Sequence, residues 1–200
     1  ARRSTAGTGL ANPHMQLEQV RFISHSAVHY LALQASIVRE TARDRFITTN
    51  GIFGNLDYQK LMESGVDFIM YDSYPNFAYA MDRREGDLKD RNFSFNLART
   101  RAISPLFGIM EQQAGPGGWN FRIHQASPKP GQLRLWTMQS VAHGADFVSF
   151  FRWRTCSFGT EIYWHGLNDY SNRPNRRLEE LSLVKADFEA IKDIAGHPYE

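Results

Sequence analysis

The stretch Leu106-Phe-Gly-Ile-Met110 is a short, almost wholly apolar run that Pro105 precedes and Glu111-Gln112 follow. Three further runs stand at intervals along the chain: a short, β-branched one at residues 45–50, and apolar ones at residues 68–74 and 147–151. Nearly continuous apolar runs of this length are typical of strands buried on both faces, as in a parallel sheet. We therefore predict four parallel strands, of which residues 106–110 form the third.

Amphipathic segments lie between these runs and indicate helices. The segment before the first strand has apolar residues at helical spacing: Val28, Leu31, Ala35 and Val38. Further helices are expected over residues 57–63, 92–103, 132–143 and 178–191. One helix followed by four strand–helix units predicts an α/β fold with a parallel sheet and right-handed crossovers.

Four strand–helix units match half of an eight-stranded (β/α)8 TIM barrel, and a flavodoxin-like open sheet would also fit. The open sheet should carry a glycine-rich phosphate loop after its first strand. The loop at residues 50–54, Asn-Gly-Ile-Phe-Gly, lacks that full fingerprint. In both folds the functional residues lie at the carboxyl ends of the strands.

The composition is that of an ordinary globular protein. Of 200 residues, 42% are hydrophobic and 22% charged, which excludes a disordered chain, a collagen-like repeat and a coiled coil. The formal net charge of +2 gives no reason to expect nucleic acid or an anionic membrane as partner. The single cysteine, Cys156, excludes an internal disulfide and a multi-cysteine metal site, and no cofactor-binding motif is present. The 13% aromatic content fits either a large core or a carbohydrate site.

Polar and aromatic residues end all four apolar runs, which favours a functional mouth at this edge of the sheet. These residues are Thr49 and Asn50, Asp72 and Tyr74, Glu111 and Gln112, and Arg152 and Trp153. Arg152 and Arg154 are expected to pair with carboxylates near the mouth, with Asp72 as a candidate partner.

Several motifs at and after these strand ends occur together. They are Thr-Thr-Asn at 48–50, Asp-Ser-Tyr-Pro at 72–75, Met-Glu-Gln at 110–112 with Gly-Pro-Gly-Gly-Trp-Asn at 115–120, Lys-Pro-Gly-Gln-Leu-Arg at 129–134, His-Gly-Ala-Asp at 143–146, Arg-Trp-Arg at 152–154, and Gly-Thr-Glu at 159–161 with His-Gly at 165–166. In this combination the chain resembles the β-galactosidases of glycoside hydrolase family 42 over most of residues 12–195.

The resemblance implies a (β/α)8 barrel that hydrolyses terminal non-reducing β-D-galactosyl residues with retention of configuration. Glu111 matches the family's nucleophile. The residue itself agrees with this role, because a carboxylate next to a buried apolar strand needs hydrogen-bond donors or a polar cavity. The alternative for Glu111 is a structural ion pair at a strand end.

The resemblance also implies sugar-binding residues. Trp119 matches a tryptophan that packs against galactose, with a core anchor as the alternative. Glu161 and His165 match an acidic residue and a histidine that hold galactose hydroxyls, although their separation of four residues is wider than expected for many members. A surface position is the alternative for His165.

Two further aromatic residues are carried over from the resemblance. Tyr74 matches a tyrosine whose hydroxyl bonds the nucleophile, and Tyr71 competes for this role. Trp153 is expected either to form the floor of the sugar site or to pack inside the barrel.

The second catalytic carboxylate is not found. In the family the acid/base glutamate follows an asparagine, and no asparagine of this chain precedes a glutamate. We therefore interpret residues 1–200 as strands five to eight of a barrel with flanking helices, with residues 1–11 poorly ordered. The isolated chain is then expected to be inactive and unstable or oligomeric.

The resemblance implies a homotrimeric parent with a β-galactoside as substrate. The residues give no reason to expect a cofactor, a metal or a membrane partner, and a cytoplasmic location is favoured. Two rival functions remain open. One is another retaining glycosidase of the same clan, such as a β-glucosidase, mannanase or arabinopyranosidase. The other is a non-catalytic sugar-binding barrel.

Overall fold

The computed structural model describes residues 12–50, 54–79, 89–104, 106–119 and 123–199. Residues 1–11, which we predicted to be poorly ordered, lie outside these ranges. The chain divides into two compact units, Ala1–Ile69 and Met70–Glu200. Strand β2 (Phe68–Ser73) begins in the first unit and continues into the second.

The first unit is built on the long helix α1 (Pro13–Thr41), with strand β1 (Thr48–Asn50) and the short helix α2 (Tyr58–Met62). Asn12 caps α1 by accepting a hydrogen bond from the His14 amide, and Pro13 occupies the first turn, where its missing N–H costs nothing. A small core of Ala35, Ile47 and Val66 joins the elements. The helix predicted around residues 28–38 is therefore present but begins much earlier.

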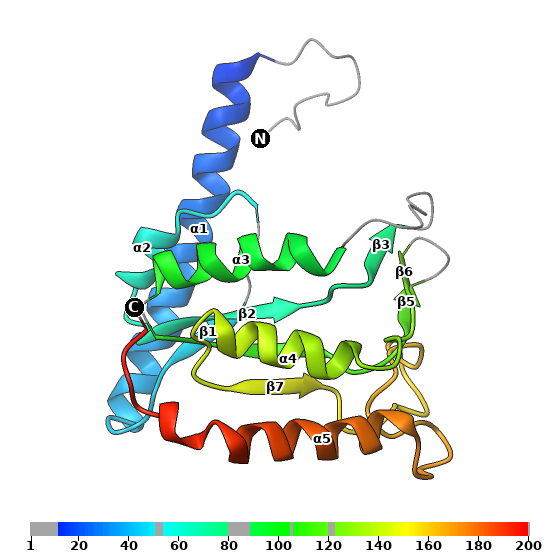
Figure 1. The fold of residues 1–200 in the computed structure, drawn as a ribbon. Helices are drawn as coiled ribbons and strands as arrows, with labels where there is room; N and C mark the ends of the chain where they lie inside the picture. Colours follow the sequence, from blue (N-terminus) through cyan, green and yellow to red (C-terminus); the bar gives the residue numbers. More distant parts are fainter. Residues whose placement is uncertain (1–11, 51–53, 80–88, 105, 120–122, 200) are drawn as a thin grey trace. The chain divides into compact units, whose positions relative to one another are not determined.

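The second unit contains the parallel sheet and three helices. Its strands follow the order β2, β4 (Phe107–Gln113), β7 (Val148–Phe151), and β4 pairs with β7 in parallel. Helices α3 (Lys89–Ile103), α4 (Gln132–Ala142) and α5 (Arg176–Ala190) flank the strands, with α4 between α3 and α5 (Figure 1), and a 3₁₀ turn, η1 (Lys192–Ile194), follows α5. All four predicted strands are present, with boundaries that differ by a few residues.

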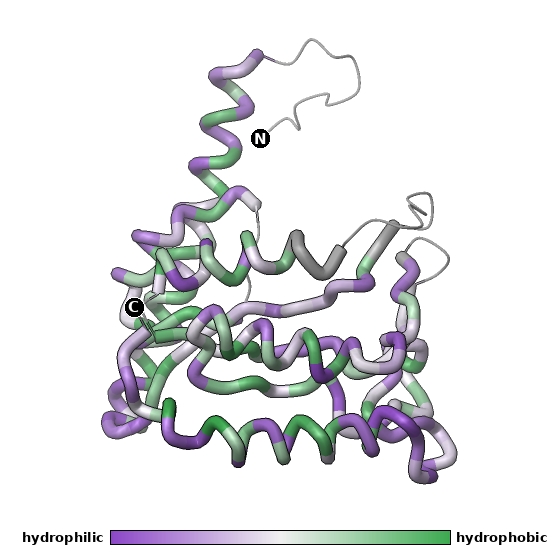
Figure 2. The backbone as a smooth tube through the Cα atoms, in the orientation of Figure 1, coloured by the Kyte–Doolittle hydropathy of each residue, from purple (hydrophilic) through white to green (hydrophobic). Residues whose placement is uncertain are grey.

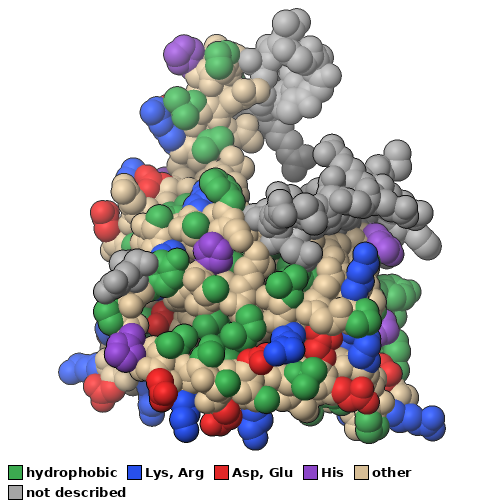
Figure 3. All heavy atoms as spheres, in the orientation of Figure 1, with side chains coloured by type: hydrophobic (Ala, Val, Ile, Leu, Met, Phe, Trp, Pro, Cys, Tyr) green, Lys and Arg blue, Asp and Glu red, His purple; other side chains and the backbone are tan. Residues whose placement is uncertain are grey.

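The core of the second unit lies where α4 meets the sheet and α5. Trp136 and Leu133 of α4 are fully buried against Ala114 and Leu167, and Phe150 of β7 packs on this group. Helix α5 alternates between apolar and polar residues along its length (Figure 2). Its exposed side carries basic and acidic side chains next to one another, along the lower edge in Figure 3. This face therefore has no single sign of charge.

A second, smaller sheet was not predicted. Strands β3 (Phe77–Tyr79), β6 (Ile123–Gln125) and β5 (Gly117–Trp119) pair antiparallel in that order. This sheet stands beyond the arrowheads of β2 and β7 in Figure 1, at the carboxyl ends of the parallel strands. It therefore lies at the edge where functional residues were expected. No helix in the described ranges is both long and apolar enough to cross a bilayer.

Candidate active site

Glu111 lies in β4, which continues to Gln113, three residues beyond the apolar run at residues 106–110. Ile109 is paired with Val148 and Gln112 with Phe150, so three steps along β4 match two along β7. The extra residue is a β-bulge, which bends a strand and redirects its side chains. Glu111 falls within this irregularity and is half-buried.

Tyr74 contacts Glu111 directly. Its hydroxyl donates a hydrogen bond to Glu111 Oε2 over 2.6 Å. Burial is the main cause that raises the pKa of Tyr74, and the hydrogen bond to Glu111 raises it further. The phenol therefore stays protonated as a donor at all ordinary pH values.

Tyr71 does not take part in this contact. Its hydroxyl accepts a hydrogen bond from Asn96 Nδ2 over 3.0 Å, and burial raises its pKa to about 12. Of the two tyrosines considered from the sequence, Tyr74 is the one whose hydroxyl reaches Glu111.

Two buried glutamines follow Glu111 and fix the end of β4. Gln113 accepts a hydrogen bond from the Asn76 amide at 3.0 Å and donates to the carbonyls of Gly115 and Ala126 at 3.1 and 2.9 Å. Gln112 Nε2 donates to the Ser73 carbonyl at 3.3 Å. The segment that carries Tyr74 is therefore tied to the strand that carries Glu111.

An aromatic group surrounds Trp164, which sequence reasoning missed. Its ring centroid lies 5.9 Å from Tyr74 and 5.1 Å from Trp119, both edge to face, and 6.3 Å from Phe77, stacked. Trp164 is only 5% exposed, whereas Trp119 is 43% exposed. Trp119 thus keeps one face accessible to solvent, while the buried Trp164 ring packs against it and fixes its position. The only sequence signal was the position of Trp164 between Glu161 and His165, which by itself assigns the ring no role.

Two glycines let the loop at residues 161–166 lie against the segment after β4. A Cβ at Gly117 would come within 2.4 Å of Trp164 Cε3, and one at Gly115 within 2.7 Å of the His165 carbonyl oxygen. The His165 amide also donates to the Pro116 carbonyl at 2.9 Å. A larger residue at position 115 or 117 would push the two segments apart.

The two predicted hydroxyl-binding residues lie in this loop. The Glu161 carboxylate accepts a hydrogen bond from the Arg152 guanidinium, so Glu161 is a carboxylate partner of Arg152. The same guanidinium donates to Cys156 Sγ. His165 packs edge to face on Tyr170 at 5.0 Å.

Burial lowers the pKa of His165, and the nearby positive charge of Arg177 lowers it further. The imidazole is therefore kept neutral near pH 7 and can act as both donor and acceptor.

Trp153 is 63% exposed in this chain, and both of its expected placements, at the floor of the sugar site or packed inside the barrel, stay predictions. The ring contacts that join Tyr74, Trp119 and Trp164 do not include it. The strand end at Asn50 belongs to the first unit, and its place at the same mouth stays a prediction. Within the described ranges no group of three or more His, Cys, Asp or Glu side chains is arranged to hold a metal ion.

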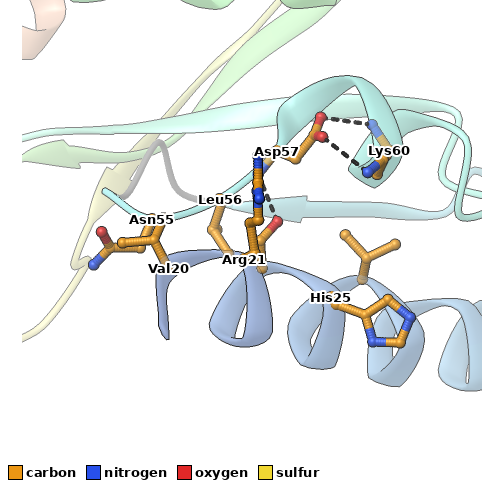
Figure 4. Close-up of a pocket in the computed structure, with 9 residues that line it drawn as sticks. Val20, Arg21, His25, Asn55, Leu56, Asp57 and Lys60 are labelled. Atoms are coloured by element: carbon orange, nitrogen blue, oxygen red, sulfur yellow. Dashed lines mark hydrogen bonds and ion pairs between the residues drawn. The ribbon is translucent and has the colours of Figure 1, made fainter. Parts of the chain in front are cut away.

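The first unit has a pocket of its own, of about 320 Å³, between α1 and the segment before α2 (Figure 4). Its one carboxylate, Asp57, is held by Lys60, with Oδ2 3.5 Å from the ammonium nitrogen. None of the residues predicted for the active site lines it.

A half-buried carboxylate near the carboxyl end of a parallel strand lies where α/β barrel enzymes carry their active sites, and carboxylates perform the chemistry of glycoside hydrolysis. The comparisons with known proteins agree. A family model described as β-galactosidase, that of glycoside hydrolase family 42, matches residues 4–191.

Individual relatives show the same likeness. β-Galactosidase BgaA of Clostridium cellulovorans is 38% identical over 189 residues, which make up 94% of this chain and 28% of that protein. β-Galactosidase Bga of Halorubrum lacusprofundi is 35% identical over 198 residues, covering 93% of this chain and 27% of that protein. The solved structure of the polyextremophilic β-galactosidase from the Antarctic haloarchaeon Halorubrum lacusprofundi matches 86% of this chain and 27% of its own, with a TM-score of 0.75 and 32% identity.

The chain belongs to glycoside hydrolase family 42. Its parallel α/β architecture fits part of the TIM barrel of that family. The chain spans little more than a quarter of the length of these relatives.

Proposed function

We propose that this chain carries the nucleophile side of a retaining β-galactosidase that hydrolyses terminal non-reducing β-D-galactosyl residues. The observation that carries the proposal is the 2.6 Å hydrogen bond from Tyr74 to Glu111 near the carboxyl end of β4. The relatives named above are all called β-galactosidases, which supports this substrate class.

The proposed reaction is a double displacement. The Glu111 carboxylate attacks the anomeric carbon while the bond to the leaving oxygen breaks and a second carboxylic acid protonates that oxygen. The same acid, now a base, then removes a proton from water, which attacks the anomeric carbon and releases Glu111. Tyr74 holds the nucleophile in its attacking position throughout.

The remaining site residues are proposed to hold the sugar. The open face of Trp119 stacks on galactose, and Glu161 and His165 bond its hydroxyls. Charged and bidentate acceptors discriminate between epimers, because a misplaced hydroxyl leaves them unpaired. Trp153 is proposed as an exposed aromatic surface at the floor of the sugar site.

The acid/base is proposed to come from residues outside these 200. We propose that the chain supplies the last four strand–helix units of the barrel, that it is inactive alone, and that the full-length protein is a homotrimer. In a retaining enzyme the two carboxyl groups stand about 5–5.5 Å apart.

The test uses a protein of full family length that contains this chain. A 2-deoxy-2-fluorogalactosyl fluoride should stop turnover of a nitrophenyl β-galactoside and leave a fluorogalactosyl ester on Glu111, seen by peptide mass spectrometry. Glu111→Gln should neither turn over the galactoside nor take up the label. Labelling of another carboxylate, or unchanged turnover in Glu111→Gln, would overturn the proposal.

Measurements on the same protein preparation distinguish the rival activities. Faster turnover of a nitrophenyl glucoside or arabinoside than of the galactoside would point to another retaining glycosidase. Galactose binding by calorimetry without any turnover would point to a sugar-binding barrel.

A further inference from the structure

We propose that Trp164 is a positioning residue that holds both the Tyr74 donor and the Trp119 stacking surface in place. This inference rests on the proposed function. It assigns a role in the reaction to a side chain that is too deeply buried to be an open sugar-stacking surface itself.

The ring contacts make Trp164 the common neighbour of the two groups. Its edge-to-face contacts reach Tyr74 at 5.9 Å and Trp119 at 5.1 Å. Phe77 stacks on the indole at 6.3 Å and packs it from a third direction. Because rings at these separations interlock in preferred orientations, a fixed indole restricts the rotation of both neighbours.

Trp164 is itself held by the backbone. The ring lies so close to Gly117 that a Cβ there would come within 2.4 Å of Cε3. The Trp164 amide donates to the Glu161 carbonyl at 3.1 Å, and the next amide, of His165, donates to the Pro116 carbonyl at 2.9 Å. The indole is thus wedged between its own loop and β5.

Hydrogen bonding by the indole does not explain its placement. Its Nε1 is buried, and no acceptor for it lies within the described part of the chain. The flat ring is therefore the feature that matters, and a phenylalanine should replace it better than an aliphatic residue of comparable burial.

The consequence is a link between nucleophile and sugar binding. Tyr74 bonds Glu111 at 2.6 Å, so a Tyr74 ring that loses its packing loosens this bond. A displaced Trp119 loses its stacking on the sugar. Loss of the Trp164 ring should therefore lower kcat and raise KM together.

The experiment is a double-mutant cycle in the full-length protein, with a nitrophenyl β-galactoside as substrate. Trp164→Leu should lower kcat about tenfold or more, and Trp164→Phe should stay within about threefold of the unchanged protein. If Trp164 acts through Tyr74, Trp164→Leu combined with Tyr74→Phe should lower kcat no more than about threefold beyond Tyr74→Phe alone.

The matched control is Trp136→Phe, which changes a fully buried tryptophan of the α4 core that packs with Leu133, Ala114 and Leu167. Trp136→Phe should lower the Tm but leave kcat and KM unchanged. It should also not alter the effect of Tyr74→Phe on kcat. If Trp164→Leu does not fold, Gly117→Ala takes its place, because the added methyl displaces the indole from the side of β5.

If the losses of kcat caused by Trp164→Leu and by Tyr74→Phe multiply fully in the double variant, the inference is overturned. A Trp164→Leu variant with unchanged kcat would also overturn it. An unchanged protein that does not hydrolyse the galactoside would instead overturn the proposed function. The two failures are therefore distinguishable.

Discussion

At the scale of single residues, the hydroxyl of Tyr74 is the most informative atom. In the full-length protein Tyr74→Phe should lower kcat on a nitrophenyl β-galactoside by roughly tenfold to a hundredfold, because a hydrogen bond to a charged group is worth about 1.5–3 kcal/mol. The ring and its packing on Trp164 remain, so the variant should fold.

Tyr71→Phe is the matched control for this change. Tyr71 also loses only a hydroxyl, but that hydroxyl bonds Asn96 and not Glu111. Turnover should be unchanged. Equal losses in the two variants would show that the Tyr74 contact has no special role in the reaction.

Sequence reasoning found the chemical groups at the site but not their supports. Glu111 and Tyr74 stand at the ends of apolar runs, and the resemblance to the family selected them from the other polar and aromatic residues there. Trp164 could not be selected, since a tryptophan in a loop has no periodic pattern and its contacts come from segments far apart in sequence. The pairing of Arg152 with Glu161 was missed for the same reason.

At the scale of elements, periodicity located the parallel strands and the helices because burial on both faces leaves a plain apolar signal. The small sheet left no such signal. Its strand at residues 117–119 reads Gly-Gly-Trp, which is not a pattern that favours a strand. The glycine at 117 instead allows the backbone to lie close to the Trp164 ring. The bulge in β4 was also invisible, because register depends on the partner strand.

The end of β4 gives a prediction about stability. Gln113→Ala removes the acceptor of the Asn76 amide, whereas the Gly115 and Ala126 carbonyls each keep a second donor, Gln125 Nε2 and Asn76 Nδ2. An amide left without its acceptor costs about 1–3 kcal/mol, so the Tm of the full-length protein should fall by a few degrees. Turnover should fall as well, because Tyr74 lies two residues before Asn76.

The exposed Gln16→Ala in α1 serves as the comparison, with an expected change within about 0.5 kcal/mol. A Tm for Gln113→Ala equal to that of Gln16→Ala would contradict the bracing role of Gln113.

Helices α4 and α5 give a prediction about pH. Arg134 Nε and Nη2 donate to the two carboxylate oxygens of Asp187 at 2.5 and 2.7 Å, and this lowers the pKa of Asp187 below its ordinary value of 3.8. A carboxylate whose pKa is lowered on folding contributes stability that is present above pH 3.8 and lost as pH falls through the lowered pKa.

Asp187→Asn should therefore reduce the difference in Tm between about pH 6 and pH 3 and leave turnover at neutral pH unchanged. The measurement is a series of thermal melts of the full-length protein at each pH. A Tm that depends on pH as steeply in Asp187→Asn as in the unchanged protein would show that the pair contributes nothing.

At the scale of the whole molecule, helix α1 exposes many large apolar side chains. Phe22 is 71% exposed and Tyr30 is 62% exposed. Others that are more than half exposed are Met15, Leu33 and Ile37. Contiguous apolar surface of this kind marks contact sites or promotes association.

The isolated 200-residue chain should therefore self-associate, and sedimentation velocity should show species larger than the 23.0 kDa monomer. Replacing Phe22 and Tyr30 together with Gln should shift the distribution toward the monomer. A purely monomeric chain would contradict this prediction, and a monomer that hydrolyses the galactoside would also contradict the proposed dependence on outside residues.

The bulge in β4 also restricts how this sequence can diverge. The pairing with β7 fixes the number of residues between Ile109 and Gln112. Insertion or deletion of one residue there would turn every later side chain of β4 to the opposite face of the sheet. Loops can lengthen freely through evolution, whereas this interval cannot. Alignments of descendants should show gaps elsewhere, with the distance from Ile109 to Glu111 unaltered.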